Sequence, residues 1–423
     1  LNLCPFAITP ATAHIQPLTC FNNTNASGNS SKLNQLGANW SHNLDSNINI
    51  TRCGDVIVTS GDAGSMRFIP AATGGGFTPA KGHHGTLIAN QVDKSFDFFS
   101  KDGTQYHFDF FATFKGWRVT AITDTNGNKL KLTVNALSKD GLVKEIEDAS
   151  GRIMSIVHES RNFEKTGITA SVITAITAPD GISLKFTYDD YGNLISSSRE
   201  QGLVASNEVY AYSTDAGLMF VHNLVKVTNA NGKISTVDYK IGNVDFKPEG
   251  ATTPVSVPNA TVQKLIAPDN GVTEFTIGTI GVGSADTTSI VTDARAKSTT
   301  YVLNKNGSAT KITDPAGVTS MVWSATDILM LSRTDANGVV ITYSYDPHGN
   351  LTTEAVNGLN VSVTTSQTWL IQQVAPYIKN RVLTRTDRRG NITSHVYDNK
   401  GNLTTENRPL SATFAHTYAA NGD

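Results

Sequence analysis

Residues 334–352, TDANGVVITYSYDPHGNLT, decide the fold, because nearly the same pattern returns at residues 386–404 as TDRRGNITSHVYDNKGNLT. Each copy holds an Asp-x-x-Gly, a seven-residue run that ends in Tyr, a second Asp-x-x-Gly, and then Asn-Leu-Thr. The two glycines of each copy are eleven residues apart. These glycine pairs are Gly338 with Gly349 and Gly390 with Gly401. The recurrence indicates a structural repeat.

Each repeat is expected to form a strand, a turn, a second strand and a second turn. An Asp that opens a four-residue turn can bond its own backbone two residues on, and Gly at the fourth place adopts conformations that a Cβ forbids. Between turns the sequence alternates, as in GISLKFTY at residues 181–188, where every second side chain is Ile, Leu, Phe or Tyr. Alternation with turn signals every ten or eleven residues predicts an all-β fold, a long antiparallel sheet of short strands.

The register is the same along the chain, because Tyr recurs seven residues after a turn Gly at four places. A slip of one residue would move every such side chain to the other face, so this constancy favours one continuous sheet. We interpret the positions as architecture, in which Asp and Gly turn the chain and Tyr packs one strand on the next. The structural repeat positions are Tyr188, Tyr239, Tyr345, Asp346, Gly349, Tyr397, Asp398 and Gly401.

Composition argues against several classes of partner. Charged residues form 17% of the chain, against a usual value of about 25%. The net charge of −2 supplies no basic surface for nucleic acid or for acidic lipid. No apolar run approaches the ~20 residues of a membrane helix, so we expect no membrane span.

The three cysteines, Cys4, Cys20 and Cys53, all lie in the first 53 residues. This clustering predicts one local disulfide, formed in an oxidising compartment, with a third thiol that is buried or free to bridge to a second chain. Three free thiols are the alternative. A metal site is disfavoured, because spacings of 16 and 33 residues contain no close Cys-x-x-Cys pair.

The chain divides into three regions. Residues 1–36, rich in Asn, Ser and Thr, are expected to form an irregular arm, residues 37–100 an N-terminal β region, and residues 101–423 the repeat sheet. Two stretches break the rhythm and predict loop insertions: residues 247–262, which hold three prolines, and residues 356–379, which lack the turns. Within the second, TWLIQQVAPYIK suggests a short helix.

No catalytic or cofactor motif is found. The chain lacks a Gly-x-Ser-x-Gly elbow and a His-Glu-x-x-His zinc motif. The adjacent His83 and His84 would point to opposite faces of a strand, which disfavours a metal there. Most aspartates open turns, and this explains them without a glycosidase pair. We therefore expect no enzymatic activity, no cofactor and no metal.

The sequence Tyr-Asp-x-x-Gly-Asn-Leu-Thr, at residues 345–352 and 397–404 and in part at residues 188–194, resembles the YD-repeat, or Rhs-repeat, family. Trp-Ser-His at residues 40–42 and KDGTQYHF at residues 101–108 fit the same resemblance. In that family the repeats build one long β-sheet that spirals into a hollow shell. The resemblance therefore implies an open or partial shell for this chain.

Members of this family include secreted polymorphic toxins, subunits of insecticidal toxin complexes, wall-associated bacterial proteins and the animal teneurins. Members that enclose a toxin carry a core segment with Asp-Pro-x-Gly-Leu and chain-cutting aspartates, followed by the toxin domain. Here Asp346-Pro-His-Gly349 is followed by Asn350, and no such core or toxin domain is seen. The resemblance thus covers the repeat region and implies neither self-cleavage nor a toxic activity.

The expected function is a non-catalytic extracellular or secreted β-scaffold that encloses, displays or connects other components. One alternative is a cell-surface adhesin or carbohydrate-binding protein, and another is a self-assembling extracellular fibre subunit. The partners to consider are an enclosed cargo, a surface glycan, or a second copy that joins through terminal sheet edges or a spare cysteine.

Overall fold

The computed structural model describes most of the chain from Leu33 onward, together with β1. No helix among these residues is long and apolar enough to cross a membrane. The described residues are 20–22, 33, 35–51, 54–61, 64–71, 76–80, 83–113, 115–125, 127–136, 141–202, 204–214, 220–246, 253, 255–278, 286–304, 307–325, 328–358, 361–374, 377–398 and 402–418.

All the regular elements of the described residues are β-strands. The N-terminal strands are β1 (Cys20–Asn22), β2 (Trp40–His42), β3 (Asn47–Ile50), β4 (Val56–Thr59), β5 (Ser65–Pro70), β6 (Phe77–Pro79), β7 (Thr86–Asn90) and β8 (Ser95–Phe99). The strands of the first half of the repeats are β9 (Gln105–Phe111), β10 (Gly116–Thr123), β11 (Lys129–Val134), β12 (Val143–Glu147), β13 (Ile153–Phe163), β14 (Ile168–Thr177), β15 (Ser183–Tyr188), β16 (Leu194–Gln201), β17 (Val204–Tyr212), β18 (Leu224–Thr228), β19 (Ile234–Phe246) and β20 (Val255–Ile266). The strands of the second half are β21 (Val272–Thr276), β22 (Thr287–Thr292), β23 (Ser298–Leu303), β24 (Ala309–Asp314), β25 (Gly317–Trp323), β26 (Met330–Thr334), β27 (Val340–Tyr345), β28 (Leu351–Gly358), β29 (Val361–Val374), β30 (Tyr377–Thr386), β31 (Ile392–Tyr397), β32 (Leu403–Arg408) and β33 (Ala412–Ala415).

The strands β3–β33 form one antiparallel sheet. From β7 to β33 each strand pairs with the next along the chain. The strands β3–β6 join this series through β3, which pairs with β10 at Trp117↔Ile48, while β11 pairs further along β10 at Ile122↔Leu130. β33 pairs with β32 and with no other described strand, so the sheet is open. The predicted all-β fold with a long antiparallel sheet is confirmed.

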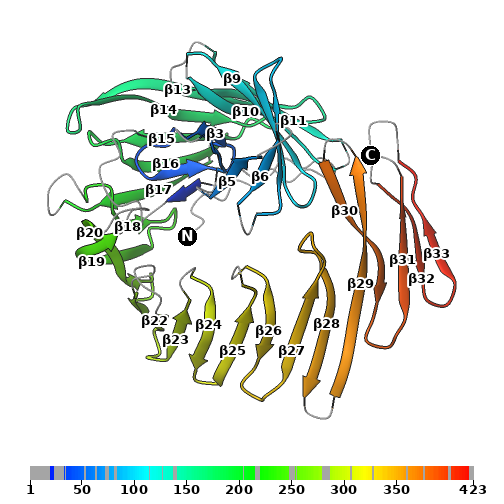
Figure 1. The fold of residues 1–423 in the computed structure, drawn as a ribbon. Helices are drawn as coiled ribbons and strands as arrows, with labels where there is room; N and C mark the ends of the chain where they lie inside the picture. Colours follow the sequence, from blue (N-terminus) through cyan, green and yellow to red (C-terminus); the bar gives the residue numbers. More distant parts are fainter. Residues whose placement is uncertain are drawn as a thin grey trace.

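The sheet curves around its own N-terminal strands. In Figure 1 the strands follow one another around a ring-like path, from β9 through β19 and β27 to β30, and the earliest strands lie inside this path. The fully buried Trp40 of β2 packs on Tyr210, with ring centroids 5.1 Å apart, and its indole donates to the Tyr212 hydroxyl at 2.7 Å. The N-terminal strands therefore provide a second layer for β10–β18.

The second half of the sheet has one layer. The main apolar core extends from Leu33 to Val227. Among the described residues after Val227, the buried apolar side chains are those of Val237, Ala260 and Met321. Hydrogen bonding between neighbouring strands, rather than a packed core, must therefore account for more of the order in β19–β33.

Where the structure describes their residues, the two predicted loop insertions are mainly strands, so that part of the prediction is wrong. Residues 255–262 belong to β20, which forms a long hairpin with β19. β21 pairs with β20 at residues 264–266. Pro258 lies outside this paired stretch, on a part of β20 whose second edge has no partner strand among the described residues. A proline is tolerated there because no ladder hydrogen bond is lost. Residues 356–379 contain the end of β28, β29 and the start of β30 instead of a helix, because β-branched residues pair on both sides there.

The predicted disulfide lies outside the described residues. Cys4 and Cys53 are not described, and Cys20 is described by its backbone in β1. Its pairing therefore stays a prediction.

Candidate functional site

The repeated turn is built around the carboxylate of its Asp. Asp346 Oδ1 accepts from the backbone N–H of His348 at 2.9 Å and of Asn350 at 2.8 Å, and Oδ2 accepts from the Asn350 side chain at 2.9 Å. Gly349 donates its N–H to Asp346 O at 3.0 Å and has φ +73°, a value that a Cβ disfavours. The Asp, Gly and Asn of the motif thus form one hydrogen-bonded turn.

The same arrangement is present in the other copies of the turn. Asp189 accepts from Asn193, and Asp398 accepts from Asn402, each through a backbone and a side-chain bond. Asp387 holds Asn391 in the same way. Gly401, which the sequence placed in this set, lies outside the described residues.

The repeat tyrosines are joined to the rest of the sheet by hydrogen bonds. Each hydroxyl donates to the backbone carbonyl of the residue fifteen positions earlier. The pairs are Tyr188 with Ile173 at 2.6 Å, Tyr239 with Leu224 at 2.9 Å, Tyr345 with Met330 at 2.9 Å and Tyr397 with Val382 at 2.8 Å. The sequence predicted side-chain packing between strands, and the bond to a backbone carbonyl was missed.

Each accepting carbonyl belongs to a residue at an irregularity in the strand pairing. The register shifts between Val322 and Trp323, and Trp323 is then opposite Met330, the residue that accepts from Tyr345. Trp323 in turn donates its indole N–H to Ala309 O at 2.7 Å. Bulges leave backbone groups outside the regular ladder, so a Tyr or Trp at this position supplies the missing donor. The sequence signal for these hydrogen bonds was the replacement of Tyr by Trp, which is also an aromatic donor, at equivalent positions of different repeats.

The Asn of the motif connects forward along the chain. Asn193, which is 1% exposed, donates its side-chain N–H to Val221 O at 3.0 Å. Asn350, which is 2% exposed, donates to the Asn380 side chain at 3.1 Å. The Tyr–Asp–Gly–Asn motif therefore connects its own hairpin to an earlier strand through Tyr and to a residue later in the chain through Asn.

A seam joins the N-terminal region to the second half of the repeats without strand pairing. Lys101 donates to Gly349 O at 2.6 Å, although 248 residues separate them, and Arg381 donates to Asp102 O at 3.4 Å. A Cβ added to Gly349 would lie 2.6 Å from the His84 ring, whereas one added to Gly390 would meet nothing within 4 Å. We call the contacts of His84, Lys101 and Asp102 with Gly349 and Arg381 the seam.

The electrostatics of the seam favour a neutral His84. Partial burial lowers the pKa of His84, and the nearby positive charge of Lys101 lowers it further, while the negative charge of Asp346 acts in the opposite direction. The seam therefore contains the fixed positive charges of Lys101 and Arg381 together with the carboxylate of Asp346.

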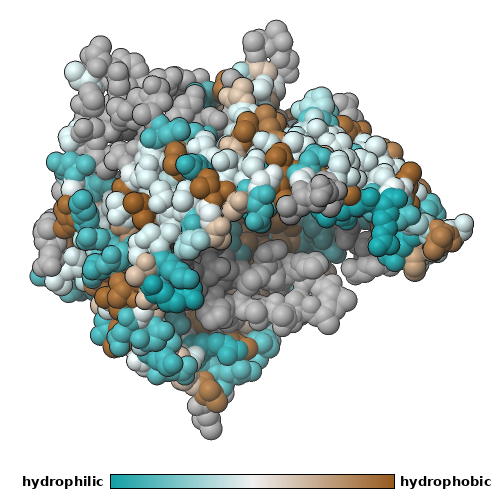
Figure 2. Space-filling view, turned by 90° about the horizontal axis from the view of Figure 1, so that it is seen from below, coloured by the Kyte–Doolittle hydropathy of each residue, from teal (hydrophilic) through white to brown (hydrophobic). Residues whose placement is uncertain are grey.

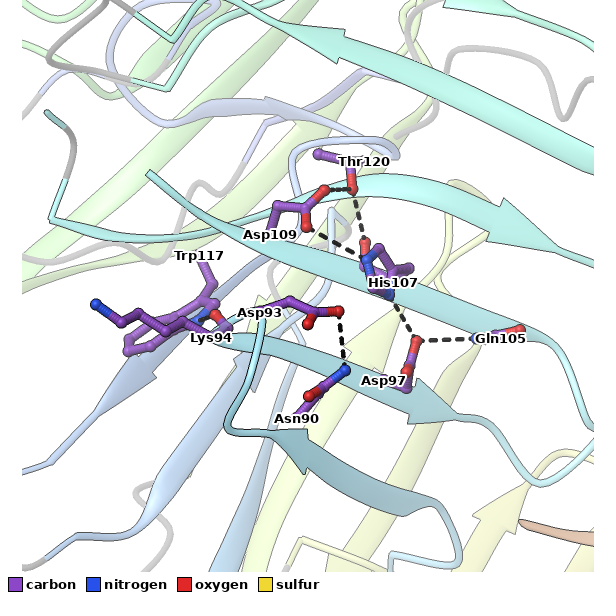
Figure 3. A network of polar contacts seen from close by, with 9 residues as sticks. All are labelled: Asn90, Asp93, Lys94, Asp97, Gln105, His107, Asp109, Trp117 and Thr120. Atoms are coloured by element: carbon purple, nitrogen blue, oxygen red, sulfur yellow. Dashed lines mark hydrogen bonds and ion pairs between the residues drawn. The ribbon is translucent and has the colours of Figure 1, made fainter. Parts of the chain in front are cut away.

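A network of polar side chains on β8, β9 and β10 centres on His107 (Figure 3). Its Nδ1 lies 2.8 Å from Asp97 Oδ1, and its Nε2 lies 3.3 Å from Asp109 Oδ1. The hydrogen bond to Asp109 and then that to Asp97 raise the pKa of His107 to about 10, so both ring nitrogens carry protons. Thr120 donates to Asp109 at 2.6 Å, and Gln105 donates to Asp97 at 2.9 Å. This arrangement cross-links three strands and leaves no unpaired base or nucleophile among its members.

A second polar cluster is buried between the N-terminal layer and the sheet. Arg118 donates to Asp45 at 2.6 Å, and Gln35 donates to Asp45 at 3.2 Å. His158 Nε2 lies 3.2 Å from Gln35 Oε1. Burial, and then the nearby His42, lower the pKa of His158 to about 4, so this histidine is neutral at pH 7. These hydrogen bonds join the N-terminal layer to the sheet.

The described residues hold no group of three or more His, Cys, Asp or Glu side chains arranged to bind a metal ion. Two cavities lie beside the N-terminal layer, with volumes of about 570 Å³ and about 420 Å³. They share Asn43 and Tyr106 in their walls.

Comparisons with solved structures returned matches of low sequence identity and low TM-score. The crystal structure of TcdB2-TccC3 is 11% identical, with a TM-score of 0.34, and the match covers 88% of this chain and 22% of the other. The structure of the Photorhabdus luminescens Tc holotoxin pore with the mutation TccC3-D651A is 12% identical, with a TM-score of 0.25, and the match covers 88% and 23%. This chain thus spans less than a quarter of the length of those chains.

A comparison with curated proteins found no matching relative. Residues 329–359, which contain the turns at Gly338 and Gly349, match the model of the RHS repeat. This match covers the motif whose Tyr, Asp, Gly and Asn make the bonds described above. The chain therefore carries a repeat of the Rhs, or YD, type at residues 329–359.

Proposed function

We propose that this chain is a non-catalytic wall segment, a secreted or extracellular scaffold that encloses, displays or connects other components. The observation that carries the proposal is the seam, in which Lys101 and His84 contact Gly349 across 248 residues of sequence. A sheet that returns to contact its own beginning surrounds a space, and surrounding a space is the geometrical requirement for enclosing a component. The repeats supply the wall, and the seam joins it to the N-terminal region.

The outer surface supports a scaffold role. The face shown in Figure 2 has hydrophobic residues scattered in small groups among hydrophilic ones. Exposed apolar side chains such as Val318, Val322 and Leu331 lie on adjacent strands, β25 and β26. A broad apolar patch would mark a large protein interface, and the scattered pattern of this face is that of a solvated wall.

Small-angle X-ray scattering tests the proposal through the dimensions of the purified chain. The double variant Lys101→Ala/Gly349→Ala disrupts the seam, because it removes the Lys101 bond to Gly349 O and places a Cβ against the His84 ring. The control Lys129→Ala/Gly390→Ala removes a lysine and the glycine of an equivalent turn away from the seam. We expect the seam variant to expand relative to the wild type and the control variant to keep the wild-type radius of gyration. Equal dimensions for all three proteins would contradict a wall held by the seam.

Self-association is a second candidate, favoured by the edge of β33. All four residues of β33 are exposed, and among the described strands it pairs with β32 alone. Open edge strands are templates for pairing with another chain. Sedimentation velocity at increasing concentration would show concentration-dependent growth if this edge joins copies, and a constant monomer would exclude it.

Carbohydrate binding by the repeat tyrosines has less support. The hydroxyls of Tyr188, Tyr239, Tyr345 and Tyr397 already donate to backbone carbonyls. Their donors are therefore engaged in holding the wall, and glycan binding stays a prediction of the sequence.

A further inference from the structure

We propose that the cavity of about 570 Å³ beside the seam is a binding site for a small organic carboxylate with an apolar body. The strands β4, β5, β8 and β9 contribute the apolar lining of the cavity, and the loops next to them contribute the rest of its walls, including His83, His84 and Lys101. This inference goes beyond the scaffold role, because it assigns the wall a ligand of its own.

The floor of the cavity suits the apolar part of such a ligand. Val58, Phe98 and Phe108 line it and are themselves 2%, 5% and 0% exposed. Aromatic and aliphatic walls with a few polar groups at one side are the usual composition of small-molecule sites.

The polar side of the cavity suits a carboxylate. Lys101, His83 and His84 line it, and no Asp or Glu is among the described lining residues, although the carboxylate of Asp346 acts on His84 from outside the lining. The Lys101 ammonium has three N–H donors, of which the bond to Gly349 O uses one. An anion placed beside it would gain charge-assisted hydrogen bonds, which are stronger than those between neutral groups.

The adjacent cavity of about 420 Å³ does not suit a carboxylate, because acidic side chains line it. Asp102, Asp124 and Asp148 line the adjacent cavity. These carboxylates would repel an anion, so the two neighbouring spaces select opposite charges. Lys129 also lines the adjacent cavity and provides a control for the loss of a lysine charge nearby.

Ligand binding would also stabilise the seam. Lys101 lines the cavity and holds Gly349, and His84 lines the cavity and lies against the same glycine. A ligand that orders these two side chains therefore favours the closed seam and raises the melting temperature by mass action.

Isothermal titration calorimetry with benzoate, and with benzyl alcohol as its neutral counterpart, tests the site in the full chain. We expect benzoate to bind the wild type. Lys101→Gln should weaken the affinity for benzoate by about tenfold or more, whereas Lys129→Gln should leave this affinity unchanged. Benzyl alcohol should bind at least tenfold more weakly than benzoate by the same reasoning.

A second variant, Met66→Trp, separates the cavity from the seam, because Met66 lines the cavity floor and is not part of the seam. We expect it to abolish benzoate binding while the radius of gyration stays that of the wild type. The proposal is overturned if benzoate does not bind, if benzyl alcohol binds equally well, or if binding survives in both Lys101→Gln and Met66→Trp. If Met66→Trp keeps both the radius of gyration and the benzoate affinity of the wild type, benzoate binds outside this cavity and the proposal is wrong.

Discussion

Tyr345 donates its hydroxyl to the carbonyl of Met330, fifteen residues earlier, at 2.9 Å. Met330 stands opposite Trp323 at a register shift between β25 and β26. One bond thus connects the end of β27 to the bulge of the preceding hairpin. The same relationship joins Tyr397 to Val382, which stands opposite Trp369. Consecutive repeats are therefore linked by an aromatic donor as well as by the strand ladder.

Removing the Tyr345 hydroxyl tests this link. Tyr345→Phe leaves Met330 O without its donor in a partly buried position, and we expect a loss of about 1 kcal/mol in local stability. Amide hydrogen exchange of β26 and β27 measures that local stability directly. Tyr343→Phe, on the same strand and face, is the control and should leave exchange unchanged. Equal acceleration in both variants would show that ring packing, and not the hydroxyl, joins the repeats.

The forward link is tested at Asn193. Asn193→Ala removes the donor to Val221 O and the side-chain partner of Asp189 from a buried site, which should cost about 1–3 kcal/mol. Asn391→Ala removes the equivalent bond to Asp387 in an exposed turn and should cost less. Thermal melting of both variants provides the comparison. A larger loss for Asn391→Ala would contradict a role for the motif Asn in linking strands.

The seam is tested by alanine at two equivalent glycines. Gly349 and Gly390 have φ of +73° and +81°, so alanine costs about 1–2 kcal/mol at either one. At Gly349 the new Cβ also meets the His84 ring. We expect Gly349→Ala to lower the melting temperature more than Gly390→Ala does. The added variant His84→Ala should remove the excess at Gly349 and leave Gly390→Ala unaffected, and failure of this rescue would argue against the His84 contact.

The His107 network predicts a pH dependence with a defined sign. Because the pKa of His107 is raised from 6.5 to about 10, its contribution to stability is fully present below pH 6.5 and is lost as the pH rises through 10. The difference in melting temperature between the wild type and His107→Gln should thus be largest near pH 6 and shrink toward pH 10. His416→Gln, in an exposed position, serves as the control. A difference that grows with pH would refute the assigned charge.

His158 predicts the opposite sign. Its pKa is lowered from 6.5 to about 4, mainly by burial, so its contribution to stability is present above pH 6.5 and declines as the pH falls toward 4. Between pH 6.5 and 4, the melting temperature of His158→Gln should therefore fall less than that of the wild type. Melting temperatures in that interval decide the matter, and parallel curves for the two proteins would contradict a buried neutral histidine.

The local part of this structure was predictable from the sequence. The Asp and Gly of each turn, the alternation between turns and the constant position of Tyr act over fewer than about a dozen residues, and such short-range signals indicate strands and hairpins. They led to the all-β sheet. They failed at residues 255–262 and in the described parts of residues 356–379, where the strands of long hairpins pair in a way that short-range signals do not show.

What only the tertiary structure decided is how distant parts of the sheet meet. Lys101 and Gly349 carry no shared local pattern, and their contact depends on the curvature accumulated over all the strands between them. The same curvature places Trp40 against Tyr210 and leaves the face around Tyr345 without a second layer. The sequence by itself thus determined the repeat and its register, whereas the summed twist of the sheet determined which repeat turn meets the N-terminal region and where the cavity beside the seam forms.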